Sequence, residues 1–262
     1  MSATTTGTAV TRTAVTRTAV TRTALVTGSS SGIGLDIARA FLERGDNVVL
    51  NGRDDGRLAK AAAVLGRPER TAWVVGDIAD RDTGEALVRT ALDRFGSADV
   101  LVNNAGTFAS KPFTEVTEEE LDGFLTHNLK GTYLTTQAFV RAVRGRGRGA
   151  AVVNIGTVLV DHGLAGFPAS APVASKAGVH GLTVSLAAEL AADGIRVNLV
   201  APGIVRTPLH EGADVDAYGG LALLNRVGEV AEISEAVLYL AAAEFVTGHV
   251  LRVDGGHVTG RS

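Results

Sequence analysis

Short apolar segments alternate with longer helical patterns along almost the whole chain, and this alternation limits the fold more than any other feature. The expected strands are 23–27, 46–51, 71–76, 98–102, 150–155, 195–200 and 249–253. The expected helices are 32–45, 54–66, 82–95, 117–143, 171–192 and 229–242. Because the strands are almost uniformly apolar, we expect both of their faces to be buried, as in a parallel sheet covered by helices. The sequence predicts one Rossmann-type α/β domain with a doubly wound parallel sheet of about seven strands, in the order 3-2-1-4-5-6-7.

Composition narrows the class of protein further. Of the 262 residues, 45% are hydrophobic, so disorder throughout is excluded. The absence of cysteine excludes a disulfide scaffold, a cysteine nucleophile and a thiolate metal site, and no His, Asp and Glu cluster has the spacing of metal ligands. The net charge of -3 gives no argument for a nucleic-acid or membrane partner, and no apolar run is long enough to span a bilayer. We expect a cytoplasmic protein.

An exact repeat precedes the first expected strand. Residues 8–22 contain the unit TAVTR three times, and a period of five matches neither a strand face nor a helix face. The tail carries three arginines and no acidic residue, which is weak support for nucleic-acid or membrane binding without aromatic residues. We expect residues 1–22 to be a flexible extension and residues 23–262 to form the domain.

A glycine-rich turn lies directly after the first expected strand and opens the first helix. It reads Thr27-Gly28-Ser29-Ser30-Ser31-Gly32-Ile33-Gly34. Glycines allow backbone amides to approach a pyrophosphate, and a helix N-terminus adds partial positive charge. A glycine-rich turn is often only a turn, but its position between a strand and a helix favours dinucleotide binding.

Polar residues end the next expected strands. The second ends in Asn51-Gly52-Arg53, where an arginine suits the 2′-phosphate of NADP and an acidic residue would bind the ribose of NAD. A solvated surface arginine is the alternative. Asp77 ends the third strand, and Asn103-Asn104-Ala105-Gly106 ends the fourth. Ligands bind at the carboxyl ends of such strands, although Asn and Gly are also common in turns.

Together these motifs resemble the short-chain dehydrogenase/reductase family. The resemblance rests on TGxxxGxG, the aspartate after the third strand and NNAG, and it covers about residues 22 to 257. It continues through Asn128, Asn154, Ser175-Lys176-Ala177-Gly178, Pro202-Gly203-Ile204-Val205-Arg206-Thr207, Thr247-Gly248 and Asp254-Gly255-Gly256.

The resemblance implies a pyridine dinucleotide cofactor and a role for each matching residue. Arg53 favours NADP(H) over NAD(H), although Asp54 and Asp55 follow it and are consistent with either cofactor. The pyrophosphate would be held by Gly28, Ser30, Ser31, Gly32, Ile33 and Gly34, and the adenosine phosphate by Arg53. The adenine would lie between Asp77 and Ile78, and the adenosine ribose beside Asn104, Ala105 and Gly106. The nicotinamide amide would meet Pro202, Gly203, Val205 and Thr207. Lys176 would hydrogen-bond the nicotinamide ribose, and Asn128 would anchor a water in the proton relay.

One departure from the family pattern concerns the proton donor. Members normally use Ser, Tyr and Lys, with the tyrosine four residues before the lysine as general acid or base. Here that position is Pro172, and no tyrosine lies between Tyr133 and Tyr218. The serine corresponds to Thr157 or, less well, to Gly156. Proline is tolerated in the first turn of a helix, so the fold need not change.

Several side chains are candidates to replace the phenol. Asp161 and His162 follow Thr157, and His210 and Tyr218 lie in a segment that usually forms a lid over substrate. His162 is the first choice because imidazole titrates near neutral pH, and Tyr218 is the second. Each of these residue types is more often an ordinary surface loop residue than a catalyst. Lys176 is a further candidate, through a water on Asn128. His127 has two interpretations, a packed helix histidine, which we favour, and a residue near the cleft.

The sequence therefore predicts an NADP(H)-dependent oxidoreductase with a non-standard proton donor, most consistent with a ketoreductase of specialised, polyketide- or antibiotic-like biosynthesis. A polycyclic or enolised ketone would need the tyrosine least, because its own hydroxyls can stabilise the oxyanion. Two alternatives stay open: a dehydratase, cyclase or isomerase without net redox chemistry, and a non-catalytic subunit. The resemblance also implies a homotetramer or homodimer, with the helices near 117–143 and 171–192 at the interface.

Overall fold

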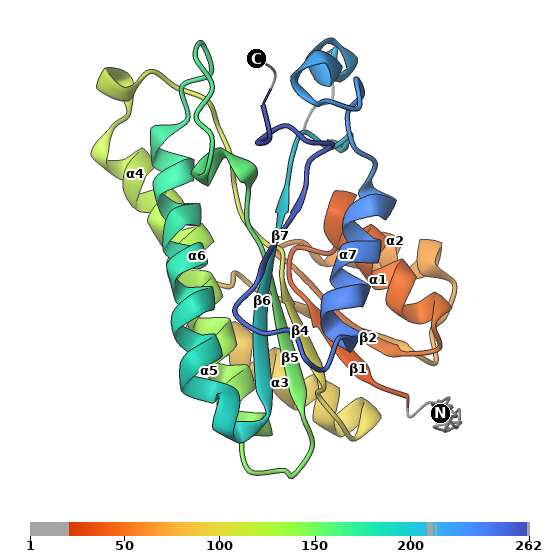
Figure 1. The fold of residues 1–262 in the computed structure, drawn as a ribbon. Helices are drawn as coiled ribbons and strands as arrows, with labels where there is room; N and C mark the ends of the chain where they lie inside the picture. Colours follow the sequence, from red (N-terminus) through yellow and green to blue (C-terminus); the bar gives the residue numbers. More distant parts are fainter. Residues whose placement is uncertain (1–20, 209–211, 213, 261–262) are drawn as a thin grey trace, which may run out of the picture.

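The computed structural model describes residues 21–208, 212 and 214–260. Within these residues, seven parallel strands form one sheet in the order β3-β2-β1-β4-β5-β6-β7 (Figure 1). The strands are β1 (Thr23–Val26), β2 (Asn47–Gly52), β3 (Thr71–Val75), β4 (Val100–Asn103), β5 (Ala150–Ile155), β6 (Ile195–Pro202) and β7 (Val250–Val253). This order confirms the predicted doubly wound sheet, and each strand lies within two residues of its expected bounds.

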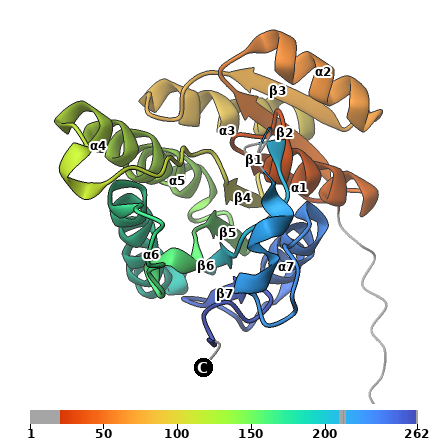
Figure 2. The same ribbon diagram turned by 90° about the horizontal axis from the view of Figure 1, so that it is seen from above.

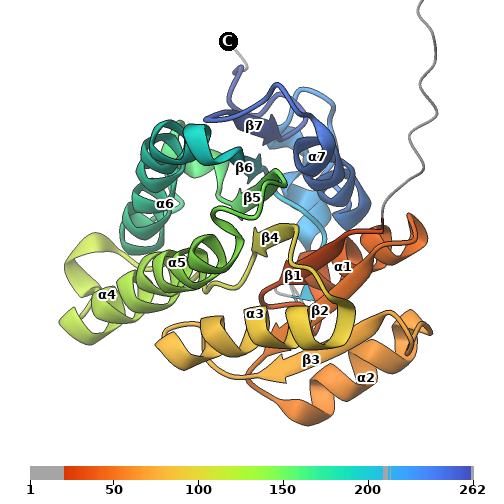
Figure 3. The same cartoon turned by 90° about the horizontal axis from the view of Figure 1, so that it is seen from below.

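Helices cover both faces of this sheet, as the apolar strands require. The α-helices are α1 (Gly32–Glu43), α2 (Asp55–Leu65), α3 (Arg81–Phe95), α4 (Glu118–Phe124), α5 (Gly131–Val143), α6 (Ser170–Leu190) and α7 (Val230–Ala242). Seen from below, α1 and α7 lie on one side of the sheet and α3, α5 and α6 lie on the other (Figure 3). None of the described helices is long and apolar enough to cross a membrane.

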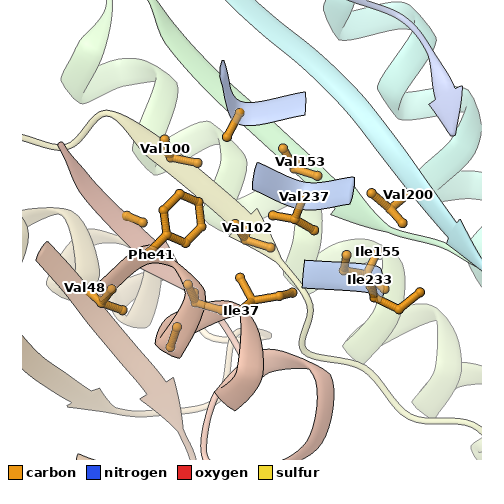
Figure 4. Packing of buried hydrophobic residues seen from close by; sticks show 14 of the residues in the cluster. Ile37, Phe41, Val48, Val100, Val102, Val153, Ile155, Val200, Ile233 and Val237 are labelled. Carbon is orange, nitrogen blue, oxygen red and sulfur yellow. The ribbon is translucent and has the colours of Figure 1, made fainter. Parts of the chain in front are cut away.

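Two buried clusters, one on each face, join the helices to the strands. On the first face, Phe41 of α1 and Val237 of α7 pack against Val102 and Val153 of the central strands, and none of these side chains is exposed (Figure 4). On the second face, Leu101 lies in a separate cluster with residues of α3, α5 and α6. Neighbouring residues of β4 thus serve opposite cores, which explains why the strand is apolar at every position.

The expected helix 117–143 is the element that differs most from its prediction. It begins with a capping box between Thr117 and Glu120, but a π-helical turn at Leu125–Lys130 (η2) separates α4 from α5. Asn128 lies in this turn and is completely buried. A widened turn inside a helix is costly and is common at functional sites, where it places a particular side chain inward.

Because all seven strands are parallel, the segments that follow them meet at one edge of the sheet. Figure 1 shows the segments after β4, β5 and β6 gathered at the upper end, and Figure 2 looks down on this end. The predicted site residues follow the strands and therefore belong to this edge. Most of the TAVTR repeat lies outside the described residues, apart from Thr21 and Arg22; the Arg22 backbone N–H donates to Asp46 Oδ1 over 3.0 Å.

Candidate functional site

The turn between β1 and α1 can be formed only by glycine at two of its positions. Gly28 has a positive φ of 62°, and a Cβ added there would lie 2.7 Å from the Cα of Ala105. A Cβ at Gly34 would lie 2.4 Å from Asn104 Nδ2 and 2.5 Å from the carbonyl oxygen of Gly28. Both distances are far below van der Waals contact, so any side chain would push the turn away from the segment after β4.

Hydrogen bonds hold this turn against the NNAG segment. Asn104 Nδ2 donates to the carbonyl oxygens of Thr27 and Gly28, each over 3.0 Å. Thr27 Oγ1 in turn accepts the backbone N–H groups of Asn104 and Ala105, also over 3.0 Å. The side chain of Asn104 therefore shapes the turn, in addition to lining the space beside it.

A cavity of about 480 Å³ lies between this turn and the ends of β2, β3 and β4. Among its walls are the predicted residues Gly28, Ser30, Arg53, Asp77, Ile78, Asn104, Ala105 and Gly106. Ser31, Gly32, Ile33 and Gly34 belong to the same turn and the first turn of α1 without lining this cavity. The structure thus brings the N-terminal motifs of the sequence together around one space of the size that small-molecule sites have.

The segment after β6 reaches the same turn from the other side. The side chain of Thr207 lies 3.9 Å from the position of a Cβ on Gly32. Gly203, next to Pro202 at the end of β6, packs closely on Asp254, because a Cβ there would lie 2.9 Å from the aspartate Cα. Val205 is buried and pairs with Gly228. These residues stand beside the glycine-rich turn but do not line the 480 Å³ cavity.

Two guanidinium groups lie at the outer end of the cavity. Arg53 is 68% exposed, and its Nη1 lies 3.9 Å from Asp77 Oδ2. Arg57 also lines the cavity, and its Nη2 donates to Ser31 Oγ over 3.2 Å. Sequence reasoning missed Arg57, although its position four residues after Arg53, in the first turn of α2, places both side chains at the same end of that helix.

The histidine of the π-helical turn also lines the cavity. His127 Nδ1 donates to the carbonyl oxygen of Gly123 over 2.7 Å, and its Nε2 lies 3.4 Å from Asp77 Oδ2. It is half-buried, and it also borders a second cavity of about 330 Å³ whose walls include Pro172. The interpretation of His127 as a packed helix histidine is therefore incomplete.

Lys176 and Asn128 lie behind Gly106, a wall residue of the 480 Å³ cavity, without lining that cavity themselves. Lys176 is half-buried, and its Nζ donates to the carbonyl oxygen of Ile155 over 2.7 Å. A Cβ on Gly106 would lie 2.8 Å from Asn128 Oδ1 and 3.3 Å from Lys176 Nζ, so only glycine fits there. Burial lowers the pKa of Lys176 from its ordinary value of 10.5 to about 8.

The amide of Asn128 is fully used by neighbouring groups. Its Oδ1 accepts the Thr107 N–H over 2.7 Å, and its Nδ2 donates to the Thr107 carbonyl and to Ser175 Oγ. Ser175 Oγ donates onward to the carbonyl oxygen of Pro172 over 2.8 Å. These bonds fix the first turns of α6 against the segment after β4.

Comparison with known proteins identifies the fold and its motifs. The family described as enoyl-(acyl carrier protein) reductase matches residues 28–258. The cis-4-hydroxycyclohexanecarboxylate dehydrogenase of Sinomonas cyclohexanicum is 40% identical over 239 residues, which are 89% of this chain and 95% of that protein. A short-chain type dehydrogenase/reductase from Mycobacterium marinum has a solved structure with a TM-score of 0.85 at 32% identity, covering 90% of this chain and 95% of its own. This chain belongs to the short-chain dehydrogenase/reductase family.

Another relative within the family is the 3-oxoacyl-(acyl-carrier-protein) reductase FabG of Vibrio harveyi. It is 35% identical over 238 residues, which are 88% of this chain and 95% of that protein. Short-chain dehydrogenases/reductases use NAD(P), and these two curated relatives are a dehydrogenase and a reductase.

Pro172 and Thr157 are the residues that the sequence motifs predict at the positions of the family's proton donor. Pro172 is buried in the first turn of α6, where its side chain offers no proton. Thr157 is half-buried at the end of β5, and its Oγ1 accepts the backbone N–H of Leu159 over 3.2 Å. The threonine hydroxyl keeps one hydrogen that it can donate, but an aliphatic hydroxyl is a poor acid at neutral pH.

The loop residues suggested as replacements have other neighbours. His162 is exposed, and its ring meets that of His257 edge to face, with 5.6 Å between the centroids. Asp161 Oδ2 accepts from Arg252 Nε over 2.8 Å. Tyr218 is 42% exposed in the 3₁₀ segment Val215–Leu221 (η6). None of the three lines the 480 Å³ or the 330 Å³ cavity, and His210 lies outside the described residues.

Proposed function

We propose that this protein is an NADP(H)-dependent oxidoreductase that reduces a ketone with a proton donor other than tyrosine. The observation that carries the proposal is the 480 Å³ cavity between the glycine-rich turn and the NNAG segment. Gly28 and Gly34 allow the turn to pack against Ala105 and Asn104, which shapes one wall of the cavity and brings the N-terminus of α1 beside it, and Lys176 lies behind the wall residue Gly106. The residues present therefore fit a pyridine dinucleotide, which when bound supplies the hydride for the carbonyl carbon.

The charges at the outer end support NADP(H) over NAD(H). Arg53 and Arg57 are both exposed beside the cavity, where they can pair with a 2′-phosphate. The two aspartates that follow β2 have other partners. Asp54 caps α2 by accepting the Arg57 N–H over 2.7 Å, and Asp55 accepts from Trp73 Nε1 over 2.9 Å. Neither is therefore required to bind a ribose hydroxyl.

The substrate we propose is a cyclic or polycyclic ketone of specialised biosynthesis. An apolar cavity of about 360 Å³ lies between the β5–α6 loop and the start of α6, with Leu159, Leu164 and Phe167 among its walls. Phe167 stacks on Phe108, with 6.0 Å between the ring centroids, so aromatic surface joins the loops after β4 and β5. The name of the relative from Sinomonas cyclohexanicum also specifies a cyclic hydroxy acid.

The test is the absorbance of the nicotinamide at 340 nm with a panel of ketones. The panel contains 4-oxocyclohexanecarboxylate, a 3-oxoacyl thioester and a hydroxylated tetralone, each with NADPH and with NADH. We expect saturable NADPH binding and oxidation of NADPH that depends on one of these ketones. A product formed with unchanged nucleotide would favour a dehydratase, cyclase or isomerase, and failure to bind either nucleotide would favour a non-catalytic subunit.

We also propose that the protein is a homotetramer or homodimer joined through α4, α5 and α6. Large apolar side chains on these helices are exposed, with Leu121 at 38%, Tyr133 at 49% and Val184 at 51%. Light scattering after size exclusion tests this assembly, and a monomer at micromolar concentration would contradict it.

A further inference from the structure

Where the tyrosine is missing, an ionisable side chain of α6 lies close to the ends of β4 and β5, behind the wall of the 480 Å³ cavity at Gly106. Lys176 reaches from α6 to the carbonyl oxygen of Ile155, the last residue of β5, and its Nζ lies beside Gly106. Gly106 lines the cavity in which we place the dinucleotide. The ammonium is therefore at the boundary between the protein interior and the space where a substrate would meet the cofactor.

The ammonium of Lys176 has hydrogen atoms to spare. Of its three donors, one is used by Ile155 O, and within the part of the chain that the structure describes no carboxylate forms an ion pair with it. Neighbouring polar groups have their own partners, because both Nδ2 hydrogens of Asn128 are donated, its Oδ1 accepts the Thr107 N–H, and Ser175 Oγ donates to Pro172 O. Two N–H bonds thus remain available to groups that enter the cavity.

The other candidates are less suitable as donors. His162 is exposed and its ring meets that of His257, and Tyr218 is 42% exposed; like Lys176, neither of them lines the 480 Å³ or the 330 Å³ cavity. His127 is tied to Gly123 O on one nitrogen and faces Asp77 with the other. Of the described candidates, Lys176 combines a mobile proton with a place directly behind Gly106, in the wall of the 480 Å³ cavity.

We propose that Lys176 itself donates the proton to the substrate oxygen during reduction, in the place of the missing phenol. This inference rests on the proposed function. As the carbonyl carbon accepts a hydride, the C=O π electrons move onto oxygen, an N–H bond of Lys176 breaks, and the O–H bond of the alcohol forms. Lys176 is left as a neutral amine and regains its proton from solvent, and oxidation of an alcohol follows the reverse course.

The ionisation of Lys176 suits this role. An ordinary lysine holds its proton too tightly to act as an acid at neutral pH, but burial without a carboxylate lowers the pKa of Lys176 to about 8. A general acid is most effective when its pKa is close to the working pH. Reduction needs the ammonium and oxidation needs the amine, so the reduction rate falls and the oxidation rate rises as the pH increases through about 8.

The first test measures ionisation without any reaction. The chain has only four lysines, at 60, 111, 130 and 176, so protein labelled with ¹³C and ¹⁵N in lysine gives four side-chain signals. We expect one signal to titrate near pH 8 in the full-length protein and to be absent from Lys176→Arg. If every lysine signal titrates above pH 10, or the signal near pH 8 survives in Lys176→Arg, the proposal is wrong.

The second test separates proton donation from positioning. Arginine keeps a cation and several donors but does not release a proton at accessible pH. With NADPH and the ketone that the panel identifies, Lys176→Arg should reduce the rate by about 10²–10⁴-fold and remove the change near pH 8, while saturable NADPH binding persists. The matched control, Lys60→Arg on the exposed side of α2, should retain both the rate and the pH profile.

A restored phenol provides the complementary result. Pro172→Tyr combined with Lys176→Arg should reduce the ketone at least about tenfold faster than Lys176→Arg alone, because tyrosine again supplies a proton. A Lys176→Arg variant with an unchanged rate and pH profile would overturn the assignment while leaving the proposed function intact. By contrast, absence of NADPH binding in the wild-type protein would overturn the proposed function itself.

Discussion

The two ends of the 480 Å³ cavity, in which we propose that the cofactor binds, differ in what they demand of the sequence. At the turn between β1 and α1, a single added carbon on Gly34 would lie 2.4 Å from Asn104, so the shape permits one residue type. At the inner end, Pro172, the residue predicted at the family's tyrosine position, lies in the first turn of α6, where Ser175 Oγ donates to its carbonyl oxygen and Lys176 Nζ donates to that of Ile155. Binding a dinucleotide requires a particular backbone surface, whereas proton transfer requires one acidic hydrogen that different groups can supply. The first end is therefore constrained by packing and the second by chemistry.

Substitution of the turn should have the largest effect. Gly34→Ala is expected to weaken NADPH binding by more than about 100-fold, because overpacking displaces the turn and typically costs about 1–3 kcal/mol in stability as well. Fluorescence titration with NADPH measures the affinity. Gly181→Ala is the matched control: it lies in α6 with open space around it, and should keep the affinity and raise the stability by about 0.5–1 kcal/mol. If Gly34→Ala and Gly181→Ala bind NADPH equally well, the turn between β1 and α1 is not constrained by packing as we describe.

At the inner end, removal of the lysine charge should stabilise the fold. A shift in the pKa of Lys176 from 10.5 to about 8 destabilises the folded protein by about 3 kcal/mol at neutral pH. The stability gained by removing the charge is smaller than this, because the amine is only half-buried and because the variant loses the hydrogen bond to Ile155 O. Lys176→Met should raise the free energy of unfolding by about 1–2 kcal/mol at pH 7.

The sign of the pH dependence follows from the same shift. Between about pH 8 and 10.5 the unfolded chain binds more protons at Lys176 than the folded one, so wild-type stability rises with pH relative to Lys176→Met. Urea unfolding of both proteins at pH 7 and pH 10 tests this. A methionine variant less stable at pH 7 would show that Lys176 is a structural group.

Loss of an arginine at the outer end should change the choice of cofactor rather than the fold. Arg53→Ala is expected to weaken NADPH binding by about 10-fold and to leave NADH binding unchanged, since a charge-assisted hydrogen bond contributes about 1.5–3 kcal/mol and this one is exposed. Arg67→Ala, at an exposed position just after α2, is the control and should alter neither affinity. Equal loss for both nucleotides would argue against recognition of the 2′-phosphate.

The smallest effect is expected in the β5–α6 loop. His162→Ala should change the reduction rate by less than about twofold, because His162 is exposed and faces His257. Steady-state kinetics with NADPH would check this. A fall of about 10²-fold or more would identify His162 as the donor and remove that role from Lys176.

Sequence patterns predicted the sheet well because each strand is buried on both faces. Val102 and Leu101 serve opposite cores, and such strands are visible as continuous apolar runs. The π-helical turn was not predictable in this way, since residues 117–143 read as one helix and the insertion depends on the tertiary bonds of Asn128. Local pattern therefore sets the elements, while the distortion in α4–α5 comes from contacts between distant segments.

The site shows the same division. Motifs that follow strands, such as Gly28 and Asn104, were found from the sequence because topology brings strand ends together. The contact between His162 and His257 joins residues far apart in the chain, and the place of His127 beside Asp77 depends on the π-helical turn. Neither could be predicted from periodicity or spacing.

The most direct test of the account is titration of the purified full-length protein with NADPH and NADH, followed by nicotinamide fluorescence. The account predicts saturable binding of both, with NADPH bound about tenfold or more tightly through Arg53 and Arg57. If neither NADPH nor NADH shows saturable binding, the claim that this cavity holds a dinucleotide is wrong.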